Sequence, residues 1–251
     1  MKKKILWLIG CLLLIGLLTY LIVKPNKKDN DLTPITLAEV THSVFYTPMY
    51  VAIENGYFKD EGIDINLLLT PGADKVSAAV ISGDADIGFA GAESAIYVYN
   101  GGEQDYLKIF SGLTKRDGQF IVSRDKKDNF EWKDLEGQEV LVGRATGMPA
   151  LNFMRALKNA GVDTSKIKIN SSVDFASLSG AFIGGTGNYV NLFEPNATLL
   201  EKQNYGYVVA SVGELSGEVP YTVFYSKKSY LDNNKELLTK RVIEAEELLV
   251  S

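Results

Sequence analysis

The chain has 251 residues, of which 46% are apolar and 23% charged, the balance of a folded globular protein. Its formal net charge is −5, but residues 1–31 carry six lysines and two aspartates, so the rest holds 20 basic and 29 acidic residues, a net −9. An acidic domain without basic runs argues against nucleic-acid binding, and we expect a small-molecule ligand instead.

The N-terminus predicts a membrane anchor. After three lysines, Ile5 to Val23 is a run of 19 residues without a charge, and about 20 apolar residues cross the hydrocarbon core as a helix. Secretory signals usually have a shorter apolar core of about 7–15 residues, followed by a small-residue cleavage site. We therefore expect an uncleaved transmembrane helix, with residues 1–31 as anchor and linker.

Two alternatives stay open for the same segment. Leu8-Ile9-Gly10-Cys11 resembles the lipobox of bacterial lipoproteins, in which the cysteine is lipidated, and a plain cleaved signal is the other alternative. Lysines flank the apolar run on both sides, so the positive-inside rule does not fix its orientation. In each case we expect the folded part on the extracytoplasmic side, anchored to the cell membrane or released from it.

Cysteine and histidine are too few for the common metal sites. Cys11 is the only cysteine and His42 the only histidine. The folded part therefore forms no internal disulfide, and neither a cysteine-based nor a histidine-rich zinc site is expected. We expect no metal and no cofactor.

From residue 35 onward, strand-like and helix-like segments alternate. Alternating β-branched and apolar residues predict strands, and apolar residues at helical spacing, bounded by Pro or Gly, predict helices. In chain order, the first expected series is strand 35–40, helix 48–55 with Thr47 as N-cap, strand 63–69, helix 73–82, strand 85–91, helix 93–100, strand 106–113 and strand 119–124. The second is strand 139–144, helix 149–160, strand 166–170, helix 174–182, strand 189–193, helix 195–203, strand 205–212, strand 221–228 and a final helix 230–250.

Two runs of βαβ units predict an α/β protein with parallel sheets, and each run is too short for one large sheet. Two lobes are the simpler arrangement. We expect lobe 1 over residues 32–112, lobe 2 over 113–218, and a return strand with a C-terminal helix over 219–251. The last helix ends in an apolar run without a glycine stop, so we expect the chain to be truncated at its C-terminus.

Ligands of open α/β sheets bind beyond the carboxyl ends of the strands, where helix N-termini also point. A helix start favours an anion by about 0.3–1 kcal/mol, so several converging starts could hold a small oxyanion. A glycine in such a turn can also be there only for the geometry of the turn, without contacting a ligand. The strand-to-helix turns in question are residues 41–47, 70–74, 89–94, 143–149, 170–174 and 192–196.

Charged residues in these turns are candidate ligand contacts. Glu93 at a helix start either contacts a ligand or only favours its own helix electrostatically. Glu194 ends an apolar strand, an expensive place for a carboxylate unless it is paired or lines a site. Arg116 and Arg144 lie near strand ends, where a ligand role and a solvated role are equally compatible with the sequence.

The stretch around His42 does not predict a catalytic pair. Ser43 is its neighbour, and neighbours on an extended segment point to opposite faces, which works against a Ser-His dyad. Phe45 and Tyr46 are also adjacent, so we expect one of them to face a cleft. No nucleophile elbow, P-loop or dinucleotide fingerprint occurs, and we expect no enzyme.

Three stretches carry a family resemblance: residues 46–67, 72–102 with its Ser-Gly-Asp-Ala-Asp-Ile-Gly segment, and 219–234. They resemble the solute-binding proteins of bacterial ABC importers in the nitrate, sulfonate and taurine group, which includes binders of thiamine-pyrimidine precursors. The resemblance implies a two-lobed periplasmic-binding-protein type II fold, with crossings near residues 112–124 and 210–226 and hinge closure on the ligand.

The resemblance also implies a site and partners. The partners would be a membrane permease and a cytoplasmic ATPase, with the binding protein a monomer. His42 would then be part of the pocket wall. The expected ligand-binding residues are His42, Ser43, Phe45, Tyr46, Gly91, Ala92 and Glu93 from the first lobe, and Arg116, Thr146, Gly147 and Glu194 from the second lobe or the hinge.

Two other classes share this fold. A fungal pyrimidine synthase resembles these binders and consumes its own histidine, but it carries a cysteine-rich iron motif that the folded part here lacks. A sensory domain is the other alternative. The ligand also stays open: helix starts favour an anion such as a sulfonate, whereas Phe45, Tyr46 and Tyr189 favour a flat pyrimidine or flavin-like ring.

Overall fold

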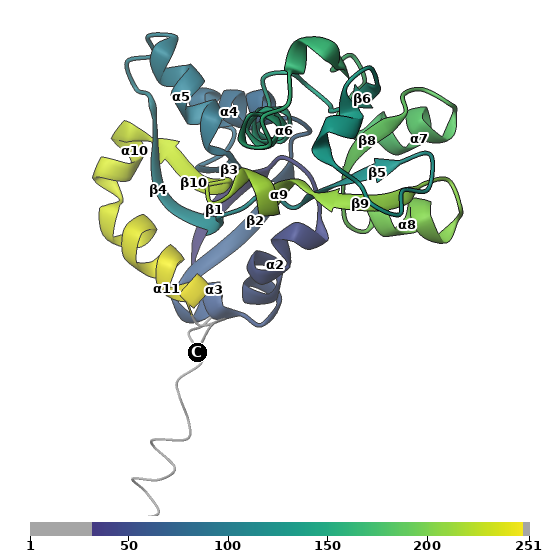
Figure 1. Ribbon diagram of the computed structural model, residues 1–251. Helices are drawn as coiled ribbons and strands as arrows, with labels where there is room; N and C mark the ends of the chain where they lie inside the picture. The colour runs from purple at the N-terminus through teal and green to yellow at the C-terminus, as the bar shows by residue number, and fades with distance from the viewer. Residues whose placement is uncertain (1–31, 248–251) are drawn as a thin grey trace, which may run out of the picture.

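The computed structural model describes residues 32–247, which form two α/β lobes, each built on one five-stranded sheet (Figure 1). In the first lobe the strand order is β2-β1-β3-β10-β4. Its strands are β1 (Thr33–Glu39), β2 (Ile63–Leu69), β3 (Ile87–Gly91), β4 (Leu107–Thr114) and β10 (Thr222–Lys227). Its helices are a 3-10 helix (Val44–Tyr46), α2 (Thr47–Glu54), α3 (Tyr57–Asp60), α4 (Ala73–Ser82), α5 (Ala92–Asn100), α10 (Lys228–Asn233), a π-helix (Leu237–Arg241) and α11 (Val242–Glu247).

The second lobe has the strand order β7-β6-β8-β5-β9. Its strands are β5 (Gln119–Ser123), β6 (Glu139–Leu141), β7 (Lys168–Asn170), β8 (Tyr189–Phe193) and β9 (Tyr207–Ser211). Its helices are α6 (Met148–Asn159), α7 (Leu178–Ile183), α8 (Asn196–Lys202), α9 (Val212–Ser216) and the 3-10 helices Trp132–Leu135, Thr164–Lys166 and Phe175–Ser177.

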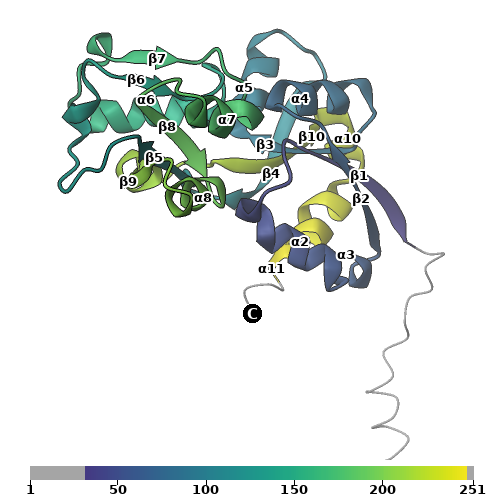
Figure 2. The ribbon, with the colours of Figure 1, turned by 90° about the vertical axis from the view of Figure 1, so that its right-hand side faces the viewer.

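Alternation along the strands sends side chains to two layers of helices. In β1, Leu37 packs with one buried cluster and Ala38 with another. The cluster around Leu37 includes residues of α2, α3 and α11, and that around Ala38 includes residues of α4 and α5. Figure 2 shows these two sets of helices on opposite faces of the first sheet. The second sheet is covered in the same way, by α6 and α9 on one face and α7 and α8 on the other.

The predicted two-lobed α/β architecture is confirmed, but the sheets are mixed and not purely parallel. In the first sheet β1 pairs in parallel with β2 and β3, and β10 lies antiparallel between β3 and β4. In the second sheet β5 lies antiparallel between β8 and β9. Each of these two strands directly follows a crossing between the lobes. β5 enters the second sheet, and β10 the first, antiparallel to both of its neighbours.

Several element boundaries differ from the sequence prediction. β2 and α4 have the predicted bounds, but α2 begins at Thr47, with Tyr46 in the N-cap position. The short helix α9 was missed. Up to residue 247, the predicted final helix 230–250 is instead α10, the π-helix and α11, with a break after Asn233. Tyr189 is also not available for a ligand, because it is buried in the core against Phe130.

The predicted anchor at Ile5–Val23, the alternative lipidation site Cys11 and the last four residues lie outside the described part of the chain. Within residues 32–247, no helix combines the length and the apolar character needed to cross a bilayer. The anchor and lipidation therefore stay predictions.

The two lobes are joined by two adjacent segments, residues 115–118 and 217–221. They are bonded to each other: Val219 N–H donates to the Lys115 carbonyl at 3.0 Å, and Tyr221 N–H donates to the Thr114 carbonyl at 2.9 Å. Next to them the Thr114 hydroxyl donates to the Thr222 hydroxyl at 2.9 Å. Since the described chain crosses between the lobes only here, the lobes can rotate about this pair of segments.

A buried carboxyl group lies in the first of these segments. Asp117 is 5% exposed, and its Oδ1 accepts a hydrogen bond from the Gln119 N–H at 2.7 Å. Burial raises the pKa of Asp117 to about 7, although the Gln119 N–H favours the charged form. The folded protein therefore keeps this proton over a range of pH in which an unfolded chain, with a pKa of about 3.9, releases it.

We predict that Asp117 lowers stability as the pH rises from about 4 to about 7, because over this range the native state binds one proton more than the unfolded state. Asp117→Asn keeps the Oδ1 acceptor and removes the titration. At pH 8 the variant should be more stable than the wild type, by at most about 4 kcal/mol, and at pH 4 the two should be nearly equal. Chemical denaturation at both pH values measures this, and an equal difference at both would contradict it.

Candidate functional site

A cleft of about 1010 Å³ lies between the lobes, at the carboxyl ends of the strands. The first lobe contributes the starts of α4 and α5, and the second contributes the β6–α6 turn and the segment before α7. Tyr221 and Thr222 from the second crossing also line it. The lining residues that carry the argument below are Asp74, Gly91, Glu93, Tyr97, Arg144, Thr146, Gly147, Met148, Phe175 and Phe193.

Glu93 lies inside this cleft and connects the lobes. It is the second residue of α5 and only 6% exposed. Its Oε1 accepts a hydrogen bond at 3.1 Å from the N–H of Met148, the first residue of α6 in the opposite lobe. Its Oε2 is buried and has no hydrogen-bond partner among the described residues. Burial raises the pKa of Glu93, and the backbone N–H groups of Glu93, Met148 and Ser94 offset part of this rise.

Two more polar contacts join the lobes around the start of α6. Arg144 forms an ion pair with Asp74, the second residue of α4 in the first lobe. The hydrogen bond from Arg144 lowers the pKa of Asp74. The hydroxyl of Tyr97 donates to the Thr146 carbonyl at 3.2 Å. With Glu93, these contacts hold the two lobes against each other.

Aromatic rings pack together where the two lobes meet at the hinge. Phe45 of the first lobe lies 5.2 Å from Phe193 of the second and 5.7 Å from Tyr221 of the crossing, measured between ring centroids. Phe175 lies 5.6 Å from Phe193. Phe45 also packs on Gly118, where a Cβ would come within 2.5 Å of the ring. The lobes therefore meet at the hinge through packed rings.

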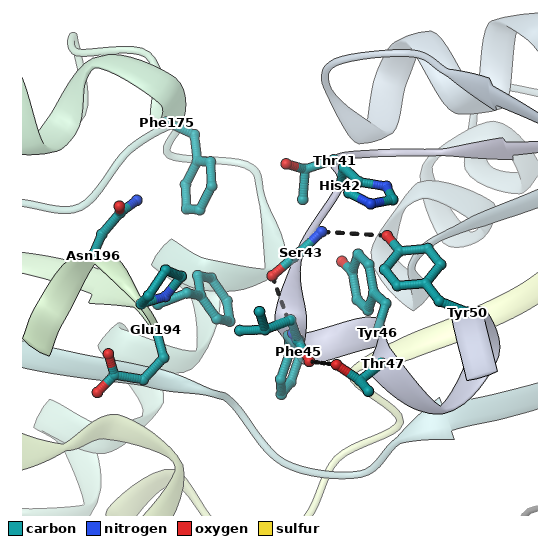
Figure 3. Close-up of a pocket in the computed structure, with 13 residues that line it drawn as sticks. Thr41, His42, Ser43, Phe45, Tyr46, Thr47, Tyr50, Phe175, Glu194 and Asn196 are labelled. Atoms are coloured by element: carbon teal, nitrogen blue, oxygen red, sulfur yellow. Dashed lines mark hydrogen bonds between the residues drawn. The ribbon is translucent and has the colours of Figure 1, made fainter. Parts of the chain in front are cut away.

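A smaller pocket of about 290 Å³ adjoins the cleft and shares part of its lining with it (Figure 3). In it, His42 Nδ1 lies 3.1 Å from Glu39 Oε1, and the Tyr50 hydroxyl donates to Glu39 Oε2 at 2.6 Å. The His42 ring also stacks on Tyr50 at 4.4 Å, although 70% of its side chain is exposed. His42 is thus tied to a buried carboxylate.

The same pocket contains no Ser-His pair. The Ser43 hydroxyl accepts from the Phe45 N–H at 3.2 Å and so caps the 3-10 helix. Across the pocket, Glu194 accepts from the N–H and the hydroxyl of Thr198 in the first turn of α8, at 3.1 and 2.8 Å. No group of three or more His, Cys, Asp or Glu that could hold a metal occurs within residues 32–247.

The predicted site residues divide into four groups. Gly91, Glu93, Thr146 and Gly147 line the large cleft, His42, Ser43, Phe45 and Glu194 line the smaller pocket, and Tyr46 touches both. Two residues line neither. Ala92 is buried in the lobe core, and Arg116 is 56% exposed beside Glu218, 3.6 Å away. Whether the lining residues contact a ligand stays a prediction.

Sequence reasoning missed several residues of the site. Glu39 follows an alternating apolar strand, and a carboxylate at a strand end was a usable signal. Asp74 lies in a turn that was singled out, but its pairing with Arg144 depends on how the lobes meet. Met148 lies in the singled-out turn 143–149, but its N–H contact with the other lobe depends on how the lobes meet. Tyr97 lies inside α5, and nothing in the local sequence distinguishes it from an ordinary helix residue.

The comparisons with known proteins decide the family. The family described as NMT1/THI5 like matches residues 44–246. The chain belongs to this family. The match confirms the resemblance that the sequence motifs carry.

One curated relative is 44% identical over 215 residues, covering 85% of this chain: "Putative binding protein YtlA" of Bacillus subtilis (strain 168). The chain spans 64% of the length of that relative. Its name describes a binding protein and states no ligand.

Solved structures share the fold at low identity. The alkanesulfonate-binding protein SsuA from Xanthomonas axonopodis pv. citri, bound to MOPS, has a TM-score of 0.70 at 16% identity, over 86% of this chain and 72% of that one. The periplasmic nitrate-binding protein NrtA from Synechocystis PCC 6803 has a TM-score of 0.71 at 17% identity, over 86% and 61%. These matches confirm a periplasmic-binding-protein-like fold.

Gly91→Ala is expected to lower the free energy of unfolding by about 1–3 kcal/mol, because the new methyl would lie 2.0 Å from Glu93 Oε2 and displace a buried carboxylate. Chemical denaturation measures the loss. In the matched control Gly112→Ala the nearest atom is 3.7 Å away at an exposed strand position, and the change should stay within about 0.5 kcal/mol. Equal losses in the two variants would argue against the tight placement of Glu93.

Arg144→Ala is expected to open the lobes of the ligand-free protein. The ion pair with Asp74 is half exposed, so its loss should cost about 1 kcal/mol at most, a shift of about fivefold toward the open form. The radius of gyration from small-angle scattering should rise. Lys166→Ala, which removes an ion pair with Glu136 within the second lobe, should leave it unchanged, and a response common to both variants would contradict the prediction.

Proposed function

We propose that this chain is the extracytoplasmic substrate-binding protein of an ABC-type importer and captures a small nutrient between its two lobes. The observation that carries the proposal is the cleft of about 1010 Å³, walled by both lobes, which are joined by only two adjacent segments. Membership of a family whose curated relative is named a binding protein supports it.

The geometry suits capture by closure. A ligand that touches both walls of the cleft binds the closed form more tightly than the open one, and so shifts the population toward closure. A membrane permease would recognise the closed form, and a cytoplasmic ATPase would drive release into the cell. We propose a monomer for this role.

The walls of the cleft favour a ligand with a flat ring. Phe175, Phe193, Tyr221, Tyr97 and Met148 all line it, so an aromatic body could stack on the rings or meet their edges. Small oxyanions are the alternative, since the starts of α4 and α6 face the same space. A pyrimidine-like or flavin-like nutrient therefore fits the walls better than nitrate.

We also propose that the lobes act outside the cytoplasm, held at the cell membrane by the apolar run Ile5–Val23. Lipidation at Cys11 and plain cleavage remain the alternatives. Mass spectrometry of the protein from membranes would distinguish an intact N-terminus from one that begins with a lipidated cysteine.

A thermal-shift panel tests the function. Aliphatic sulfonates, nitrate, pyrimidines and flavins are each added to the purified protein. A ligand present at about 100 times its dissociation constant should stabilise the protein by about 2.7 kcal/mol, because it binds only the folded state. Scattering should then show a smaller radius of gyration with the same compound. If no class changes the stability, the proposal fails.

A further inference from the structure

We propose that Glu93 selects the ligand: its carboxylate pairs with a cationic or hydrogen-bond-donating nitrogen group on a flat ring, and the cleft rejects oxyanions. The inference rests on the proposed function and names the ligand class that this site takes. Three observations support it. One carboxylate oxygen of Glu93 is buried without a partner, acidic side chains outnumber basic ones in the cleft, and the Glu93 carboxylate already occupies the helix starts that could bind an anion.

The unpaired oxygen is the first reason. Only 6% of Glu93 is exposed, and its Oε2 has no hydrogen-bond partner among the described residues. A buried carboxylate oxygen without a hydrogen-bond partner destabilises the folded protein. Since Glu93 lines the cleft, a donor on a bound ligand can supply the missing bond. A charged donor would form the stronger of the possible bonds.

The charge of the cleft is the second reason. Four carboxylates line it, from Asp74, Glu93, Glu103 and Asp174, against two cations, Lys75 and Arg144. Arg144 is already paired with Asp74 at the junction of the lobes. No unpaired arginine of the described chain therefore lines the cleft to grip an oxyanion in a bidentate way.

The helix starts are the third reason. The N–H of Met148, at the start of α6, donates to Glu93 Oε1, and Glu93 itself lies in the first turn of α5. The carboxylate of the protein thus occupies the place that a bound anion would take between these two starts. An anionic ligand entering here would meet a buried negative charge at short range, which is costly in a site of low dielectric.

The test uses three probes with one ring and different head groups: benzamidine (cationic), benzamide (a neutral donor) and benzenesulfonate (anionic). The dissociation constants are measured by ligand-observed NMR for the wild type and for Glu93→Gln. The glutamine keeps an oxygen for the Met148 N–H and removes the charge. We expect the wild type to bind benzamidine at least tenfold more tightly than benzenesulfonate, and Glu93→Gln to lose at least tenfold for benzamidine but less than threefold for benzamide.

Asp128→Asn is the charge control, because Asp128 is 85% exposed and pairs only with Lys126, away from the cleft. It should change each dissociation constant by less than twofold. Circular dichroism confirms that both variants are folded. A Glu93→Gln protein that is not folded is replaced by Glu93→Asp, which keeps the charge and should keep the preference for benzamidine.

The outcomes separate the two proposals. A wild type that prefers benzenesulfonate, or a Glu93→Gln variant that binds benzamidine as the wild type does, overturns the role of Glu93 while the capture function stands. A wild type that binds none of the three probes also overturns this role. If in addition no compound of the broader panel stabilises the protein, the capture function fails as well.

Discussion

The hydrogen bond from the Met148 N–H to Glu93 joins the lobes inside the cleft, and the shape of the cleft depends on it. A buried carboxylate is tolerated only where the structure compensates its charge. Here Gly91 leaves room for it, since a Cβ at that residue would lie 2.0 Å from the carboxylate, and the first turns of α5 and α6 supply favourable dipoles. The side chain therefore fixes both the distance between the lobes and the chemistry of the space between them.

The two crossing segments that form the hinge also limit the shape of the cleft. The two crossing segments are bonded to each other, and Phe45, Phe193 and Tyr221 pack together from the first lobe, the second lobe and the crossing. Rotation of the lobes has to repack these rings. Phe193 lines both the cleft and the smaller pocket, whereas His42, bound to Glu39, lines the smaller pocket and not the cleft.

Much of the fold could be predicted from the sequence because local residue patterns determine where its strands and helices begin and end. The alternation in Ile63–Leu69 and the glycine after Ser82 gave β2 and α4 their bounds. The antiparallel placement of β5 and β10 could not be predicted, because it depends on which sheet a strand joins after a crossing. Likewise Glu93 was a candidate from its place at a helix start, whereas its bond to Met148, 55 residues away, depends on how the two lobes meet.

The position of β10 in the first sheet has a consequence for how the protein can fold. β10 lies between β3 and β4 in the first sheet, although it follows the whole second lobe in the chain. A fragment that ends before Thr222 would have β3 and β4 without the strand that joins them, and an unpaired hydrophobic edge. The first sheet is therefore completed only after the second lobe has been synthesised.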